Sequence, residues 1–278
     1  MNRRLFLKAT MAAAGVTPVF AAGYGLYEAS NVAIDRQTLA LPRLPAAFEG
    51  TRVAFLTDIH HGPFTNLDYV VSVVRTTLAL EPDLILLGGD YCLRDAKYIR
   101  PCIDTLAALK APLGVFAVMG NHDYWHGERE TREALKAAKI TELTNAGLWM
   151  KSDKSGFWLA GVDDLWTGRV DVAAALGYTT RDGACLLVSH NPDLAETLRD
   201  PRVGLMLSGH THGGQVVFPA AGAPWTPSRY GAKYRRGLVR GPEARVYVSR
   251  GLGTSGVPVR IGSRPEINLI TLTAGRSA

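Results

Sequence analysis

The chain contains 278 residues, of which 47% are hydrophobic, and it carries a formal net charge of +6. This composition excludes a disordered chain, and the length is sufficient for a domain with a sizeable core. Three of the positive charges, on Arg3, Arg4 and Lys8, lie near the N-terminus. The small excess that remains suits a mildly anionic partner, and it excludes the strongly basic surface that is typical of a nucleic-acid-binding protein.

Residues 1–28 are expected to be a targeting segment rather than part of the fold. Residues 2–8 resemble the twin-arginine export pattern, in which two arginines precede Phe-Leu-Lys, and an alanine-rich stretch follows. Residues 9–27 contain no charged side chain, and a run of this length approaches the roughly 20 residues that span a bilayer. We expect export by the twin-arginine machinery to the periplasm or the outer face of the inner membrane. The segment is then a cleaved signal or a retained anchor; a basic amphipathic helix is the alternative.

Residues 29–50 have the polar, proline-bearing composition of a lead-in segment. From residue 51 onward, apolar runs of strand length alternate with segments of helical periodicity. Strands are expected at 52–57, 84–87, 114–119, 140–150, 156–162, 186–188, 204–207, 215–218, 246–249 and 268–272, and helices at 66–80, 98–110, 128–139 and 192–198. Helices early and strands late predict an α/β fold of two packed mixed β-sheets flanked by helices. No linker divides residues 51–278, so we expect one domain.

Five of the predicted strands end in polar residues of the kinds that bind metals. The strand at 84–87 is followed by Gly88, Gly89 and Asp90, so a carboxylate stands at the end of a buried strand. The other four strands end in Asp58-Ile59-His60, Gly120-Asn121-His122-Asp123, Ser189-His190 and Gly209-His210-Thr211-His212. Five of the seven histidines therefore fall at strand ends, which histidines scattered through a core would not do.

These strand ends supply the donors for two metal ions. The candidate ligands are Asp58, His60, Asp90, Asn121, His190, His210 and His212. So many ligands exceed the needs of one ion but suit two ions that share a carboxylate. Imidazoles combined with oxygen donors favour Mn, Zn or Fe over Mg and Ca. Two such ions lower the pKa of a bridging water from ~16 towards ~7, which gives a hydroxide nucleophile and two positive charges facing a phosphoryl group.

The five motifs, in this order, resemble those of the calcineurin-like metallophosphoesterases, over about residues 51 to 273. The resemblance implies a four-layer sandwich and a dinuclear hydrolase of phosphate esters. It also implies that a first metal is bound by Asp58, His60 and His212, a second by Asn121, His190 and His210, and that Asp90 bridges them. In the family pattern His122 contacts the phosphate and protonates the leaving oxygen, with Asp123 orienting its imidazole.

The substrate is left open by these motifs. The twin-arginine start and the stretches 209–215 and 250–256 are similar to the exported or membrane-associated bacterial branch of the family. One alternative substrate is a lipid-linked UDP-sugar pyrophosphate of the UDP-diacylglucosamine type. An alternative of another class is a non-catalytic metal-binding protein, although a non-ligand histidine such as His122 is not needed for binding alone.

For several other residues the sequence leaves the role open or predicts a role outside the metal site. Cys92 and Cys102 are either a disulfide pair or buried thiols. His61 is expected to project away from the site, whereas Trp125 and His126 either line the site or lie in a solvated loop. Asp163 and Asp164 are expected to cap a loop or helix. The basic stretch 229–240 is either a solvated loop or a lip over the metals that contacts a second phosphate or an anionic lipid surface.

Overall fold

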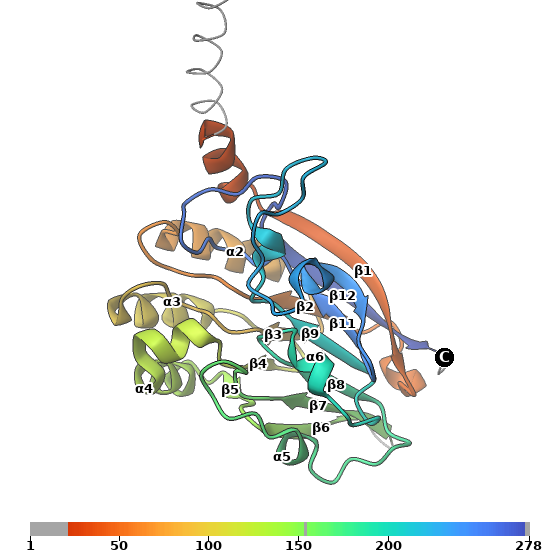
Figure 1. Ribbon diagram of the computed structural model, residues 1–278. Helices are drawn as coiled ribbons and strands as arrows, with labels where there is room; N and C mark the ends of the chain where they lie inside the picture. The colour runs from red at the N-terminus through yellow and green to blue at the C-terminus, as the bar shows by residue number, and fades with distance from the viewer. Residues whose placement is uncertain (1–21, 153–154, 276–278) are drawn as a thin grey trace, which may run out of the picture.

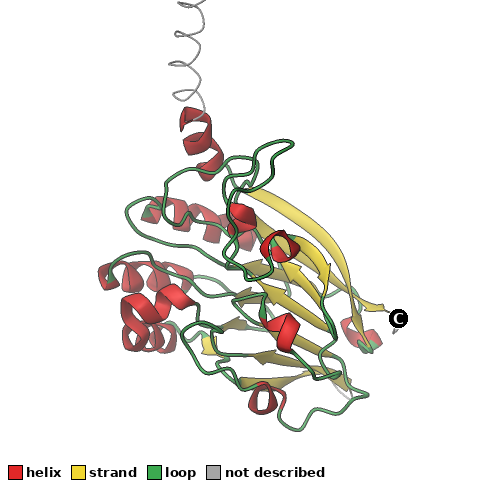
Figure 2. Ribbon diagram, in the orientation of Figure 1, coloured by secondary structure: helices red, strands yellow, loops and turns green. Residues whose placement is uncertain are grey.

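The computed structural model describes residues 22–152 and 155–275, in which two six-stranded sheets face each other (Figures 1 and 2). The first sheet has the order β1-β12-β2-β3-β4-β5 and the second the order β10-β11-β9-β8-β7-β6. The strands are β1 (Ala33–Pro42), β2 (Arg52–Leu56), β3 (Leu84–Leu87), β4 (Val115–Ala117), β5 (Thr141–Glu142), β6 (Ala146–Ser152), β7 (Ser155–Gly161), β8 (Cys185–Val188), β9 (Leu205–Ser208), β10 (Gly237–Arg240), β11 (Arg245–Val248) and β12 (Glu266–Gly275).

Both sheets are mixed, with a parallel central portion. Strands β2 to β5 run parallel to one another and β12 is antiparallel to β2, whereas β7, β8, β9 and β11 are parallel and the edge strands β6 and β10 are antiparallel. Carboxyl ends of neighbouring parallel strands share one edge of a sheet. The ends of β2, β3 and β4 therefore lie together in the first sheet, and those of β8 and β9 lie together in the second.

Helices cover the outer face of each sheet. They are α2 (Leu67–Ala79), α3 (Ile99–Leu106), α4 (Asn121–Ala137), α5 (Val172–Leu176) and α6 (Leu194–Thr197), with short 3₁₀ turns at Ala46–Phe48, Ala96–Tyr98, His212–Gly214 and Gly231–Tyr234. A further helix over residues 22–30 projects from the body at the N-terminal end (Figure 1). Helices α2, α3 and α4 pack on the first sheet, and α5 and α6 on the second.

The alternation of side chains along the strands explains this layering. In β3, Leu84 and Leu86 contribute to the core between the two sheets, whereas Ile85 and Leu87 face the helices. Both faces of the strand are buried, which is why its sequence is a continuous apolar run rather than an alternating one. The predicted fold of two packed mixed sheets flanked by helices is confirmed.

Several expectations differ from the structure. The stretch 140–150 forms two strands, β5 and β6, in different sheets, and α5 and β10 were not expected. The lead-in 29–50 contains β1, which pairs in parallel with β12 over ten positions, so the sheet begins at Ala33. This edge strand starts with the half-exposed stretch Ala33–Thr38, so it lacks the apolar run of a central strand. Segment 215–218 is a loop with isolated bridges from Val216 to Ile261 and from Phe218 to Gly222. Helix α4 begins at Asn121 instead of 128, because Gly127 only kinks it.

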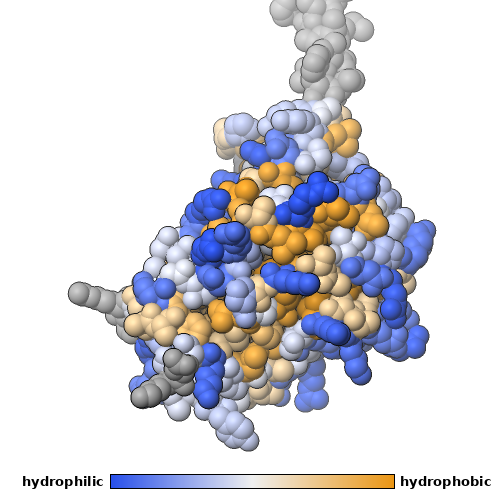
Figure 3. All heavy atoms as spheres, turned by 180° about the vertical axis from the view of Figure 1, so that it is seen from behind, coloured by the Kyte–Doolittle hydropathy of each residue, from blue (hydrophilic) through white to orange (hydrophobic). Residues whose placement is uncertain are grey.

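The exposed surface mixes apolar and charged side chains, as Figure 3 shows from behind. Orange, apolar side chains lie between blue, hydrophilic ones over much of this face. On the helix over residues 22–30, Tyr24, Leu26 and Tyr27 are each more than half exposed. Among the described residues, no helix combines the length and the apolarity needed to cross a membrane. The predicted signal over residues 1–28 lies mostly outside the described residues.

Candidate metal centre

The structure gathers the seven predicted ligands at the facing edges of the two sheets. They follow the carboxyl ends of β2, β3, β4, β8 and β9, and all are buried. The first group is formed by Asp58, His60 and His212, with Nε2 of His60 lying 3.1 Å from Nε2 of His212. The latter nitrogen is also 3.5 Å from Oδ1 of Asp58. These three donors therefore converge on one small volume.

A second group is formed by Asp90, His190 and His210. Nε2 of His190 lies 3.2 Å from Nδ1 of His210. Two nitrogens bound about 2.1 Å from one ion lie roughly 3.0–3.4 Å apart for angles between square and tetrahedral. Both close nitrogen pairs in the site have this spacing, which suits two imidazoles that share an ion.

Asp90 belongs to the second group and also faces the first. Its Oδ2 atom is 3.5 Å from Nε2 of His60 in the first group and 3.2 Å from Nε2 of His190 in the second. Its Oδ1 atom accepts a hydrogen bond from the backbone N–H of His122 at 2.8 Å, which fixes the carboxylate in this orientation. One carboxylate oxygen therefore faces both sets of imidazoles.

Two polar atoms in the site are buried without a protein partner. Oδ1 of Asn121 and Nε2 of His210 have no hydrogen bond among the described residues. An unsatisfied buried polar atom costs on the order of 1–3 kcal/mol and therefore calls for an explanation. Asn121 begins α4 directly beside Asp90, and its free amide oxygen is a suitable donor for a metal.

The backbone at the site is held in an uncommon conformation. Positive φ values, between 48° and 68°, occur at five of the predicted ligands, namely Asp58, His60, Asp90, His210 and His212. Such a conformation costs a non-glycine residue on the order of 1 kcal/mol and clusters at functional sites. Neighbouring glycines allow the loops to approach, since a Cβ atom on Gly209 would lie 2.2 Å from Oδ2 of Asp58.

The protonation states of three site histidines suit metal binding by neutral imidazole. Burial lowers the pKa of His60 to about 3 and lowers those of His210 and His212 well below their ordinary value. These rings are therefore neutral with a free lone pair. His190 differs, because the Asp90 carboxylate outweighs the effect of burial and raises the pKa of His190 well above its ordinary value, so a metal must displace a proton from this ring. Nδ1 of His190 lies 2.8 Å from the carbonyl oxygen of Gly88, which can only accept, so this nitrogen carries a proton and Nε2 faces Asp90.

His122 lies at the site without joining either close nitrogen pair. Its ring packs edge-on against His60, with centroids 4.6 Å apart, and burial lowers its pKa. Asp123 was expected to orient this ring, but the structure places it elsewhere. The Asp123 carboxylate accepts hydrogen bonds from the backbone N–H groups of Asp90, Tyr91 and Gly120 at 2.8–2.9 Å. Asp123 is the third residue of α4, so its side chain points back to the start of the helix and joins it to the Asp90 loop.

The partner of the His122 ring is His126. Nδ1 of His122 lies 3.2 Å from Nε2 of His126, one turn along α4. The sequence placed His126 either at the site or in a solvated loop, ahead of a helix that was expected to begin at residue 128. The spacing of four residues is the signal that identifies this pair, once residues 121–126 are known to be helical.

His61, the two cysteines and the paired aspartates lie outside the metal-facing groups. His61 is buried, with Nδ1 2.8 Å from the carbonyl oxygen of Thr65, and does not join the metal-facing groups. The cysteines Cys92 and Cys102 are buried free thiols rather than a disulfide. Asp163 and Asp164 do cap the loop after β7, as expected, by accepting backbone N–H groups of residues 164–169.

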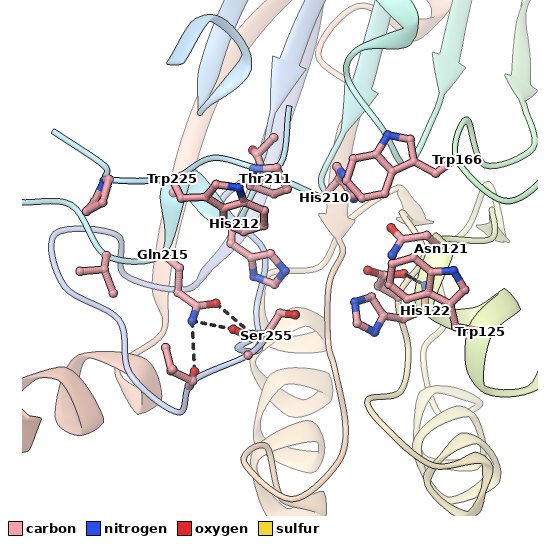
Figure 4. Close-up of a pocket in the computed structure, with 17 residues that line it drawn as sticks. Asn121, His122, Trp125, Trp166, His210, Thr211, His212, Gln215, Trp225 and Ser255 are labelled. Atoms are coloured by element: carbon pink, nitrogen blue, oxygen red, sulfur yellow. Dashed lines mark hydrogen bonds between the residues drawn. The ribbon is translucent and has the colours of Figure 1, made fainter. Parts of the chain in front are cut away.

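A cavity of about 480 Å³ opens over the metal-facing residues. Its floor is formed by Asp90, Asn121, His122, His210 and His212. Figure 4 shows the labelled members of this set together with the tryptophans Trp125, Trp166 and Trp225. The basic stretch 229–240 does not line the cavity. The lip predicted from that stretch is instead provided by residues 214–227 and 255–257.

The fold and this centre define a metal-dependent phosphoesterase, and the comparisons with known proteins agree. The profile of the calcineurin-like phosphoesterases matches residues 51–214, and the chain belongs to this family. It is 35% identical to the phosphodiesterase YaeI of Escherichia coli K12, over 98% of this chain and 99% of that protein. It is 32% identical to the uncharacterized metallophosphoesterase YkuE of Bacillus subtilis 168, over 98% of each chain.

More distant similarity extends to solved structures. The NAD nucleotidase NadN of Haemophilus influenzae superposes with a TM-score of 0.47 at 14% identity, covering 73% of this chain and 45% of that one. Membership of the family sets aside the non-catalytic alternative, since the chain is an enzyme that acts on a phosphate ester with a divalent metal centre.

Proposed function

We propose that the protein is a dinuclear phosphodiesterase whose metals are held by the seven ligands gathered at the strand ends. Asp58, His60 and His212 would hold one ion. Asn121, His190 and His210 would hold the other, and Asp90 would contact both. The observation that carries this proposal is the position of Oδ2 of Asp90, within 3.5 Å of an imidazole nitrogen of each group. Mn, Zn and Fe suit these donors.

Two divalent ions, when bound, supply an activated water and neutralise charge on a phosphoryl group. The chain's own residues act around them. His122 lies at the cavity floor beside His60, so its Nε2 atom can give a proton to the leaving oxygen. His126 holds Nδ1 of the same ring, and Asp123 keeps the Asp90 loop in register with the start of α4. The assignment to diesters is supported by the name of the E. coli relative.

Metal content and turnover together test this proposal. Purified protein loaded with Mn or Zn is expected to contain two ions per chain and to hydrolyse p-nitrophenyl phosphodiesters faster than the corresponding monoester. Chelation should abolish turnover, and re-addition of metal should restore it. Two bound ions with no turnover of any phosphate ester would contradict the proposal, and so would one ion per chain with full activity.

We also propose that the enzyme works outside the cytoplasm, at or near the inner membrane. The twin-arginine pattern at residues 2–8 and the uncharged stretch 9–27 support export, and exposed Tyr24, Leu26 and Tyr27 support contact with a membrane surface. Replacing Arg3 and Arg4 by lysine should retain the protein in the cytoplasm. Fractionation of cells expressing the full chain, with Arg129→Lys as a matched control on α4, measures this; export of the double variant would contradict it.

A further inference from the structure

The cavity above the metal centre has walls of a different character from its floor. Beyond the metal-facing residues, its lining is largely apolar and includes Trp125, Trp166, Val216, Pro224, Trp225, Pro227 and Val257. Three of these side chains are tryptophans, which are 54%, 41% and 70% exposed in chain order. Large apolar side chains left open to solvent beside a polar centre indicate a binding surface rather than a core.

One wall is held firmly against the floor. The Trp166 ring packs edge-on against the His210 ring with centroids 4.2 Å apart. Its backbone N–H donates to Oδ2 of Asp164 at 2.9 Å, and the backbone N–H of Thr167 donates to the same oxygen at 2.8 Å. This indole is therefore positioned before a ligand arrives.

The Gln215 side chain braces the opposite wall (Figure 4). Gln215 donates from Nε2 to the carbonyl oxygens of Ser255 and Val257 at 2.9 and 3.1 Å, and its Oε1 accepts the N–H of Ser255 at 2.9 Å. These bonds join the loop that carries Val216 and Trp225 to the loop that carries Val257. The apolar surface is thus built from two loops fastened to each other.

Charge is nearly absent from these walls. Among the described residues that line the cavity, Asp90 is the only Asp, Glu, Lys or Arg, and it belongs to the floor. Arg94 packs on Phe64 and reaches the carbonyl oxygen of Gly256, but it is not part of the lining. A second phosphate placed against these walls would lose water without gaining a cation, which is unfavourable.

We infer that this cavity binds a bulky, uncharged hydrocarbon group attached to the scissile phosphate. The inference rests on the proposed phosphodiesterase function and narrows its substrate to diesters with one phosphate and an apolar arm. The hydrocarbon can be a flexible alkyl chain or a planar ring, since indole and proline surfaces contact both. A diphosphate-linked arm is disfavoured, which separates this substrate class from UDP-sugar pyrophosphates.

The test compares p-nitrophenyl phosphodiesters whose second alcohol is methanol, hexanol or phenol, using the full chain loaded with Mn. Each additional methylene that is buried should raise kcat/KM by about fourfold. We expect the hexyl or the phenyl ester to exceed the methyl ester by at least tenfold, and the larger ratio identifies the kind of arm. The p-nitrophenyl hexyl diphosphate, in which a second phosphate precedes the arm, should lose most of this advantage.

Variants connect the selectivity to the wall. Trp225→Ala should reduce the hexyl-to-methyl or phenyl-to-methyl ratio several-fold, and Trp166→Ala should do the same. Trp149→Ala is the matched control, because this tryptophan is also 45% exposed but lies on β6 outside the cavity. It should leave the ratio unchanged.

The outcomes separate this inference from the function on which it rests. Turnover of the methyl ester with ratios near one for both arms would overturn the apolar subsite and leave the phosphodiesterase intact. A diphosphate cleaved as well as the hexyl monophosphate diester would overturn the single-phosphate assignment. Absence of turnover for every ester would overturn the proposed function and this inference together.

Discussion

The floor and the walls of the cavity are built on opposite principles. The floor consists of buried polar side chains at the ends of central strands, in a strained backbone that packing on both sheets enforces. The walls consist largely of exposed apolar side chains on loops and on the first turns of α4, and a few hydrogen bonds join the loops. The difference teaches that reactivity and selectivity are carried by separate parts of the chain. Changes to the floor should affect all substrates alike, and changes to the walls should affect them unequally.

The largest effect is expected from Asp90→Asn. An amide oxygen carries no charge with which to neutralise two ions, so metal affinity and turnover should fall together. We expect a loss of at least about 10³-fold, since several kcal/mol of transition-state stabilisation depend on the metals. Metal content and kcat/KM on the methyl and hexyl esters measure this effect. The control variant is Asp104→Asn, at an exposed position away from the site. Unequal losses of kcat/KM on the methyl and hexyl esters would contradict the assignment of Asp90 to a floor that serves all substrates alike.

His122→Asn should leave the metals in place and slow the reaction. Loss of a general acid costs about 10²–10⁴-fold where the leaving group needs a proton. The loss should be large for esters of aliphatic alcohols and small for esters of p-nitrophenol, which leaves readily as an anion. Metal analysis together with rates on both kinds of ester measures it. Equal losses for the two leaving groups would refute the assignment of His122 as the acid.

A smaller effect is expected from His126→Ala. This change removes the partner of the His122 ring, and a lost hydrogen bond of about 1–1.5 kcal/mol corresponds to roughly a tenfold loss of kcat. KM should stay constant because His126 is absent from the cavity lining. His126→Gln keeps a polar partner and should restore part of the rate. A change confined to KM would instead place His126 in substrate binding.

The smallest effect, and one confined to the walls, is expected from Gln215→Ala. This variant removes three side-chain hydrogen bonds between the two wall loops and leaves the backbone bonds of Ile261 to Gln215 and Val217, so the apolar surface becomes less well defined. The preference for the hexyl or phenyl ester over the methyl ester should decline about two- to threefold, because a net hydrogen bond contributes about 0.5–1.5 kcal/mol. Metal content should not change. A loss of bound metal would show that the walls support the floor.

The sequence predicted the floor well because strand ends are local signals. Gly89-Asp90 and Ser189-His190 follow apolar runs, and parallel strands bring such ends to one edge. The local geometry of the ligand pairs was not predicted, however. Asp58 with His60 and His210 with His212 lie in turns with positive φ that follow the strands.

The walls could not be predicted in the same way. Trp125, Trp166 and Trp225 come from a helix and two separate loops, and no periodicity relates residues so far apart in the chain. The segment 215–218 looked like a strand because its apolar residues are contiguous, but they contribute to an open surface instead. Helix α4 was expected only from residue 128, whereas it begins at Asn121, and the pairing of His122 with His126 depends on the part that was missed.

Hydrogen bonds join the helix over residues 22–30 to the body of the enzyme. Buried Glu28 accepts the N–H of Ser263 at 2.9 Å, and the carbonyl oxygen of Gly25 accepts the N–H of Arg260 at 3.0 Å. The Arg260 guanidinium in turn reaches Nδ1 of His212 at 3.2 Å. The helix over residues 22–30 is therefore fastened to the segment that contacts a histidine of the metal centre, so its orientation relative to the cavity is fixed.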